Sequence, residues 1–242
     1  MTGPRRIAGV IGGMGPAATI DFMAKVLACS QATRGPGSVE QDDVRLLVDS
    51  NPGVPDRNAA VAGTGASPGP HLAAMARGLG RAGADFLVMP CNAAHAFSDH
   101  ITVATPLPFV HLINEAVRAV RTGHPLVRKV GVLAVAATAD KRLYECALER
   151  EGITALVPDG TAREHFMTTL WRIKSGDTGA DVRTAMRHLA EALLANGAEL
   201  IIAGCTEVPL VLSAADLQVP FLDATLVLAE RTVAYARGEV LP

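Results

Sequence analysis

The chain has 242 residues, of which 49% are hydrophobic, and a formal net charge of −2. This length suits one large domain or two small ones with a buried core. A near-neutral charge argues against nucleic acid or a membrane surface as partner, because both select basic proteins. No apolar run approaches the roughly 18 residues of a membrane span, and the first residues lack signal-peptide features. We therefore expect a cytosolic protein.

Short apolar runs alternate with longer helical patterns along the whole chain. The predicted strands are 6–11, 44–48, 85–89, 108–110, 129–134, 154–157, 199–203 and 220–222, and the predicted helices are 16–28, 70–81, 93–100, 112–121, 139–150, 162–174, 180–195 and 224–237. This alternation is typical of βαβ units and parallel sheets. Because the strands are almost unbroken apolar runs, we expect an α/β protein whose sheets are covered on both faces.

An internal repeat organises these elements. The segment 83-GADFLVMPCNAA resembles 197-GAELIIAGCTEV, and in both a cysteine follows the first glycine by eight residues. The segments 108-PFVH and 220-PFLD follow the two cysteines, and 7-IAGVIGG and 129-KVGVLAV precede them. Three paired landmarks in one order predict two related α/β halves. The first half spans 1–107 with 223–242 and carries Cys91; the second spans 108–222 and carries Cys205.

The two cysteines lie where a strand is followed by a helical pattern. Ligands of parallel sheets bind beyond the carboxyl ends of the strands, so halves related by a pseudo-twofold axis would present Cys91 and Cys205 to a shared cleft. A helix N-terminus beside each sulfur would favour the thiolate. Two opposed bases suit the removal of a proton from one face of a carbon and its replacement on the other.

The other two cysteines and the glycine-rich turn have simpler interpretations. Cys29 and Cys146 lie within amphipathic helical patterns and are expected to pack there. No C-x-x-C pair or ligand cluster indicates a metal site. The turn 12-GGMGPAA-18 lacks the acidic residue that a dinucleotide fingerprint needs about 20 residues later. No feature of a pyridoxal phosphate (PLP) site accompanies any of the four lysines. No cofactor is therefore expected.

The sequence resembles the PLP-independent aspartate/glutamate racemase superfamily and is closest to its aspartate racemase branch. The resemblance is carried by 9-GVIGGMGPAAT-19, 49-DSNPGVPDR-57, 83-GADFLVMPCNAAHAF-97, 173-IKSG-176 and 201-IIAGCTEVPLVL-212. It implies a racemase of aspartate or glutamate, a small-molecule substrate and a homodimer. It also implies two-base catalysis, in which one cysteine thiolate abstracts the α-proton and the other cysteine, as a thiol, returns one.

The resemblance further implies roles for individual residues. Cys91 and Cys205 align with the catalytic cysteines, and Arg57 and Lys174 align with cations that bind the substrate's side-chain carboxylate. The expected α-carboxylate site comprises Gly13, Met14, Asn92, Thr138 and Thr206. Ala93 replaces the threonine that the family usually has, so a hydroxyl is missing from this site. Asn51, His95 and Glu207 are candidate supporting residues.

Several of these residues also have ordinary structural interpretations. His95 lies four residues after Cys91, so it could form a Cys/His dyad or simply belong to a polar packing network. Glu207 could set the protonation of Cys205 or stabilise the first turn of a helix. Arg57 lies in a Gly- and Pro-rich stretch, residues 50–70, expected to be a long binding loop. Lys174 ends a predicted helix, where a cation is favourable anyway.

Two other functions remain open from the sequence. A maleate-type isomerase would use one cysteine as a nucleophile on a related dicarboxylic acid. A sensor would bind amino acids without catalysis, and the change at Ala93 is the main support for it. The racemase hypothesis alone requires exchange of the α-hydrogen.

Overall fold

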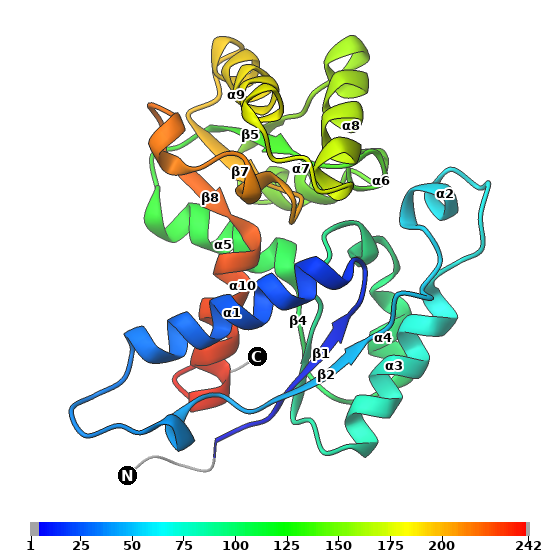
Figure 1. Cartoon of the computed structure of the whole chain (residues 1–242), viewed down its shortest axis with the longest axis vertical. Helices are drawn as coiled ribbons and strands as arrows, with labels where there is room; N and C mark the ends of the chain where they lie inside the picture. Colours follow the sequence, from blue (N-terminus) through cyan, green and yellow to red (C-terminus); the bar gives the residue numbers. More distant parts are fainter. Residues whose placement is uncertain (1–4, 241–242) are drawn as a thin grey trace. The chain divides into compact units, whose positions relative to one another are not determined.

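The computed structural model describes residues 5–240, so the ends of the first predicted half, 1–4 and 241–242, lie outside it. The chain divides into two compact units. One runs to Glu115 and resumes at Thr225, and the other is Ala116–Ala224. The chain passes between the units within helices α5 (Leu112–Gly123) and α10 (Ala224–Arg237), which Figure 1 shows in green and red.

Each unit contains one four-stranded parallel sheet, and the two sheets have the same strand order. The first sheet has the order β2-β1-β3-β4, with strands β1 (Ala8–Gly12), β2 (Leu46–Ser50), β3 (Phe86–Val88) and β4 (Phe109–Val110). The second has the order β6-β5-β7-β8, with strands β5 (Lys129–Leu133), β6 (Thr154–Leu156), β7 (Leu200–Ala203) and β8 (Phe221–Asp223). The predicted α/β class is confirmed, and every strand bound lies within two residues of its prediction.

The boundary between the units comes later than the sequence suggested. Strand β4 pairs with β3 in parallel, with Leu87 opposite Phe109, and the Leu87 N–H donates to the Pro108 carbonyl at 2.8 Å. Residues 108–115 therefore belong to the first unit, whereas the prediction placed them in the second. The later crossing, between Ala224 and Thr225, lies two residues beyond the predicted one.

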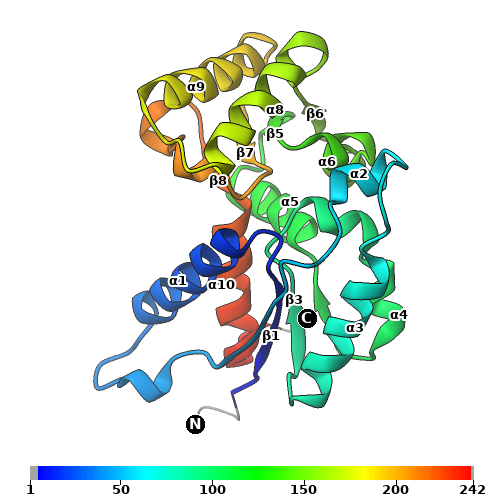
Figure 2. The same ribbon diagram turned by 45° about the vertical axis from the view of Figure 1, so that its right-hand side comes forward.

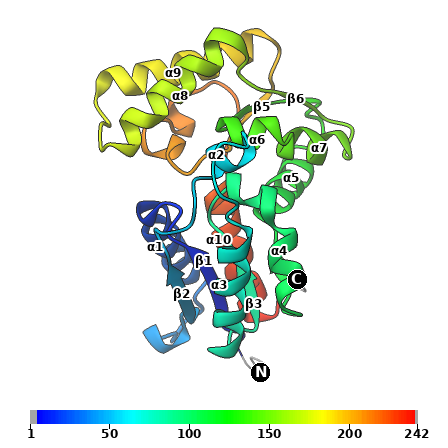
Figure 3. The ribbon, with the colours of Figure 1, turned by 90° about the vertical axis from the view of Figure 1, so that its right-hand side faces the viewer.

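Helices cover both faces of the first sheet. Helices α1 (Pro16–Ala32) and α10 lie on one side, and α3 (Gly69–Arg81) and α4 (Asp99–Ala104) lie on the other (Figure 2). In the second unit α8 (Gly160–Lys174) lies beside α9 (Ala180–Ala195), as Figure 3 shows. No helix within residues 5–240 is long and apolar enough to cross a bilayer.

Equivalent glycines allow the same close packing in both units. A Cβ atom on Gly9 would lie 2.8 Å from the Leu87 side chain and 3.2 Å from Cβ of Leu79. A Cβ atom on Gly131 would lie 2.6 Å from the Ile201 side chain and 3.1 Å from that of Leu193. Gly9 thus allows β1 to lie close to β3 and to α3, the helix that precedes β3. Gly131 allows β5 to lie close to β7 and to α9, the helix that precedes β7. The sequence repeat therefore corresponds to the same strand and helix packing in both units.

The repeated Gly-Ala-acid motif also has one structural role in both units. Gly83 and Gly197 follow helices α3 and α9 with φ of 95° and 93°, a left-handed conformation that favours glycine after a helix. Asp85 then accepts a hydrogen bond from the Ile7 N–H at 2.7 Å. Glu199 accepts one from the Lys129 N–H at 3.0 Å. The acid thus ties the beginning of one strand to the beginning of its neighbour.

Three predicted segments differ in the structure. The predicted helix 93–100 is a 3-10 helix, η2 (Ala93–Phe97), followed by α4. The predicted helix 139–150 is divided into α6 (Ala136–Asp140) and α7 (Leu143–Glu149), because Arg142 takes a left-handed φ of 48° between them. The expected loop 50–70 contains the short helix α2 (Arg57–Val61), since Asp56 caps it by accepting from the Ala59 N–H at 2.7 Å.

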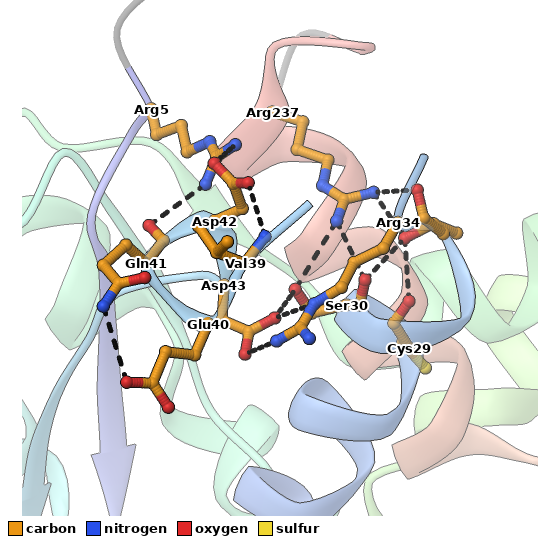
Figure 4. A network of polar contacts seen from close by, with 11 residues as sticks. Arg5, Cys29, Ser30, Arg34, Val39, Glu40, Gln41, Asp42, Asp43 and Arg237 are labelled. Atoms are coloured by element: carbon orange, nitrogen blue, oxygen red, sulfur yellow. Dashed lines mark hydrogen bonds and ion pairs between the residues drawn. The ribbon is translucent and has the colours of Figure 1, made fainter. Parts of the chain in front are cut away.

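A polar network fixes the C-terminal end of α1 within the first unit (Figure 4). Arg237 of α10 donates to the Ser30 carbonyl at 2.9 Å. Asp43 accepts from the Ser30 hydroxyl at 2.9 Å and forms an ion pair with Arg34. Because these partners lie on both α10 and the segment before β2, α1 is held from two sides.

Candidate active site

Cys91 lies just beyond the end of β3. Residues Phe86 to Pro90 are buried, and the Cys91 side chain is itself 7% exposed. The Cys91 N–H donates to the Met89 carbonyl at 2.9 Å, which turns the chain out of the strand. The five-residue 3-10 helix η2 follows. The predicted helix after Cys91 is thus a short 3-10 turn, which carries little of the dipole of an α-helix.

His95 binds backbone on both sides of its ring. Its Nδ1–H donates to the Cys91 carbonyl at 2.9 Å, and its Nε2 accepts from the Leu112 N–H at 3.1 Å. Because a carbonyl only accepts and an N–H only donates, the ring is neutral with its hydrogen on Nδ1. Both ring nitrogens are therefore occupied by backbone groups rather than by the thiol. This geometry supports a role in positioning the Cys91 backbone.

Acid is expected to destabilise the protein through His95. Burial, together with the charge of neighbouring His111, lowers the pKa of His95 well below the usual 6.5. The unfolded chain therefore binds more protons below about pH 6.5, and the free energy of unfolding falls by up to about 1.4 kcal/mol per pH unit. Urea titrations between about pH 7 and 5 should show a steeper loss for the wild type than for His95→Gln. Equal slopes would contradict this expectation.

The glycine-rich turn after β1 joins the segment that carries Arg57. Gly13 has a φ of 88°, and a Cβ atom there would lie 2.3 Å from the Asn51 backbone nitrogen, so only glycine fits. The Gly13 N–H donates to the Thr19 hydroxyl at 2.8 Å. Arg57, the first residue of α2, donates to the Met14 carbonyl at 3.3 Å. The turn at Gly13 and Met14 therefore packs directly against the segment from Asn51 to Arg57.

The predicted residues of the first unit are brought together. Met14 and Cys91 belong to one buried cluster, which also contains Val54 from the Arg57 segment. Asn92 and Ala93 continue from Cys91 and are 3% and 7% exposed. Asn51 uses its side-chain oxygen locally, since it accepts from the Gly53 N–H at 2.9 Å.

Cys205 has a different environment in the second unit. Its thiol donates to Oε2 of Glu207 at 2.9 Å. The same carboxylate oxygen accepts from the Thr206 hydroxyl at 2.9 Å, and Oε1 pairs with Nζ of Lys174 at 2.8 Å. The ammonium also lies 5.9 Å from the centre of the Trp171 ring. Lys174, which the resemblance assigns to the substrate, is thus paired with a protein carboxylate.

The charges around Cys205 favour its thiol form. Burial raises the pKa of Cys205 well above its usual value, and the Glu207 carboxylate raises it further, against the opposing charge of Lys174. Burial would also raise the pKa of Glu207, but the Lys174 charge and the donated hydrogen bonds outweigh it and lower that pKa. Cys205 is therefore protonated while Glu207 is ionised. The helix that follows, η3 (Val208–Leu210), has three residues, and the raised pKa of Cys205 contradicts the predicted stabilisation of its thiolate.

Removing the Glu207 charge should make Cys205 easier to deprotonate. In Glu207→Gln the negative charge that raises the thiol pKa is lost while Lys174 remains, so the thiolate should form at lower pH. We expect the pH profile of thiolate absorbance to shift downward relative to the parent when both proteins carry Cys91→Ala. An unchanged profile would show that Glu207 does not control this thiol.

Other polar groups of the second unit were less evident from sequence. Tyr144 is fully buried, and burial, with the charges of Asp223 and Cys205, raises its pKa well above the usual value. Asp223 is the last residue of β8, and His111 occupies the equivalent position directly after β4. The repeated segments 108-PFVH and 220-PFLD were the sequence signal for Asp223. Thr138 is 1% exposed, and its buried hydroxyl has no hydrogen-bond partner among residues 5–240. A bound ligand could satisfy that hydroxyl.

Two parallel sheets of identical order, each with a buried cysteine just beyond its third strand, define an α/β protein with a thiol site in each repeated unit. The chain belongs to the Asp/Glu/Hydantoin racemase family, whose model matches residues 11–232. The predicted family, fold class and reaction class are confirmed.

Similar proteins agree with this assignment. A broad specificity amino-acid racemase, RacX, from Bacillus subtilis is 26% identical over 93% of this chain and 96% of its own. The structure of Picrophilus torridus aspartate racemase is 25% identical, covers 96% of this chain and 94% of its own, and has a TM-score of 0.79. A glutamate racemase of Bacillus anthracis, at 16% identity and a TM-score of 0.68 over 97% of this chain and 82% of its own, shares the fold.

Proposed function

We propose that this protein is a cofactor-independent racemase of aspartate, glutamate or both, and that Cys91 and Cys205 are its two bases. The observation that carries the proposal is the equivalence of the two cysteines. They follow β3 and β7, which occupy the same position in two sheets of the same order, in a chain of the racemase family. Racemisation requires one proton-transfer group on each face of the α-carbon, and two equivalent thiols meet that requirement.

In one direction the Cys91 thiolate takes the α-proton. The S–H bond forms as the C–H bond breaks, and the electron pair is delocalised into the α-carboxylate. The Cys205 thiol then donates its proton to the opposite face of the carbon and becomes a thiolate. Glu207 supports this step because it holds Cys205 as a thiol before the reaction. The reverse direction exchanges the two roles, so the cysteines titrate as a coupled pair.

Charge that builds on the α-carboxylate must be stabilised, because the α-hydrogen is a very weak acid. We assign this to pre-organised donors, namely the backbone around Gly13 and Met14 and the side chains of Asn92, Thr138 and Thr206. The unpartnered hydroxyl of Thr138 supports its place in this set. Ala93 contributes no hydroxyl. Fewer donors to the carboxylate would slow the reaction rather than change its type.

Arg57 and Lys174 are the proposed recognition groups for the substrate's second carboxylate. An arginine offers a planar pair of donors, and a lysine offers a mobile charge. Arg57 is held by the Met14 carbonyl and by the carbonyls of Val54 and Pro55 at 3.3 and 3.1 Å. Lys174 would have to share its charge between Glu207 and a substrate. Closure of the segment around α2 over the substrate would exclude water.

The decisive test is incubation in D₂O with a panel of L- and D-amino acids and no added cofactor. We expect deuterium at Cα of aspartate or glutamate, with formation of the other enantiomer. The panel should include non-acidic amino acids, because the similar protein RacX is described as having broad specificity. Maleate belongs in the panel as well, since its isomerisation would favour the alternative enzyme. Binding without exchange would favour a sensor and overturn the racemase proposal.

We also propose that the protein is a cytosolic homodimer, as the resemblance implies. A reducing cytosol would keep its thiols free. Within residues 5–240 the four cysteines are all free thiols.

A further inference from the structure

Helix α1 presents large apolar side chains to solvent. Ile20, Met23 and Leu27 are 68%, 40% and 47% exposed and recur at helical spacing, so they lie along one side of the helix. We define the apolar face of α1 as its outward-facing residues: Pro16, Ala17, Ile20, Met23, Ala24, Leu27, Ala28, Gln31 and Ala32. No charged residue belongs to it. We propose that this face is the surface through which two copies of this chain associate.

The charges of α1 lie at the edge of this face. Asp21 and Lys25 are the two charged residues of the helix, and they form an ion pair with each other at 2.6 Å. Both side chains are partly buried, at 30% and 18% exposed. On a helical projection they lie together on one flank, about 100° and 140° from Ile20, because each residue advances by about 100°. The face therefore has a neutral centre and one flank with a charge of each sign.

This distribution favours a second copy as the occupant. In a twofold interface the same surface meets itself, so a face of one charge sign would repel its copy. The apolar face of α1 avoids this because its centre is neutral. When two such helices pack antiparallel about an axis near Met23 and Ala24, Ile20 of one copy meets Leu27 of the other. Asp21 then lies opposite Lys25 of the other copy, so the flanking charges attract.

Helix α1 is also anchored to the first unit, and a surface that is ordered before binding lowers the entropic cost of association. Its C-terminal end is anchored by Arg237 and Asp43 through Ser30 (Figure 4). Its inward side buries Phe22 and Val26, which are 0% and 2% exposed. The backbone that carries the outward apolar face is therefore held by contacts on its other side. Val48 of β2 is a further exposed apolar residue in this unit, at 37% exposed.

The first test measures mass by sedimentation over a range of protein concentrations. The wild type should be a dimer, and Ile20→Glu with Leu27→Glu should be a monomer whose circular dichroism is unchanged. Val103→Glu is the matched control, because Val103 is 87% exposed but lies on α4; it should remain a dimer. A monomeric wild type, or a dimer that keeps its affinity in the double variant, would overturn the proposal.

Two further variants keep the test informative if the glutamate variant folds poorly. Asp21→Lys should weaken the dimer by placing like charges opposite each other, and adding Lys25→Asp should restore it. Ala24→Cys should give a covalent dimer under mild oxidation, whereas Val103→Cys should not. Failure of both the charge rescue and the cross-link would contradict the antiparallel arrangement. These outcomes do not depend on whether the protein is a racemase.

Discussion

Replacing either Cys91 or Cys205 with alanine is expected to lower racemisation by about 10²- to 10⁴-fold in both directions. Each thiol donates or accepts a proton in every turnover, and positioned acid–base groups typically contribute effects of about this size. The measurement is kcat/KM for the L-to-D and D-to-L reactions of aspartate and glutamate. Cys29→Ala and Cys146→Ala are matched controls and should keep near-normal activity, because both lie in helices away from strand ends.

Exchange experiments with the same variants separate the two bases. A protein that retains one cysteine can still remove and return a proton on one face of the α-carbon. Cys91→Ala should therefore exchange the α-hydrogen of one enantiomer slowly in D₂O without inverting it, and Cys205→Ala should exchange that of the other. If both variants exchange the same enantiomer, or if either keeps full racemisation, the two-base mechanism is wrong.

Glu115→Ala is expected to destabilise the protein by about 3–5 kcal/mol, the usual cost of removing one partner of a buried ion pair. The Glu115 side chain is 4% exposed and pairs with Nε of Arg231 at 2.8 Å. It also accepts a hydrogen bond from the Tyr235 hydroxyl at 2.9 Å, and the Arg231 guanidinium lies over that ring, 5.2 Å from its centre. Removing the carboxylate would leave a cation and a buried hydroxyl without their acceptor.

Thermal unfolding provides the measurement for Glu115→Ala. For a chain of this size the expected loss corresponds to about 6–20 °C in Tm. Glu149→Ala is the matched control, because Glu149 pairs with Arg142 while both side chains are more than half exposed, at 54% and 58%. Such a pair contributes at most about 1 kcal/mol. Similar losses in the two variants would show that burial of the Glu115 pair adds nothing.

The fold could be predicted because its signals are local. A buried parallel strand is a short apolar run, and glycines and prolines mark its ends, so the strands were located to within two residues. The Gly-Ala-acid motif repeats because both units need the same backbone structure. In each unit the glycine takes a left-handed conformation, and the acid accepts a backbone hydrogen bond from the beginning of the neighbouring strand. The break at Arg142 could not be predicted, since arginine rarely takes a left-handed conformation.

The candidate site was predicted unevenly. Cys91 and Cys205 stood out because the chain repeats their surroundings, and their catalytic roles remain a proposal. The α-helical start expected after each cysteine was wrong, because a short 3-10 helix follows each one, and at Cys205 the pKa of the thiol is raised rather than lowered. Ala93 and its missing hydroxyl were visible in the sequence, whereas the unpartnered hydroxyl of Thr138 was visible only after folding.

Residue order alone was therefore sufficient for the class of fold, the internal repeat and the equivalence of the two thiols, since all three depend on patterns of a few neighbouring residues. Folding was needed to show that the thiols are unlike in environment. Lys174 reaches Glu207 across 33 positions, and His95 reaches Leu112 across 17. Such contacts arise where strands and helices distant in sequence end side by side, and no local pattern encodes them. They make Cys205 a protonated thiol bound to a carboxylate, and they leave Cys91 on a backbone held by a neutral imidazole.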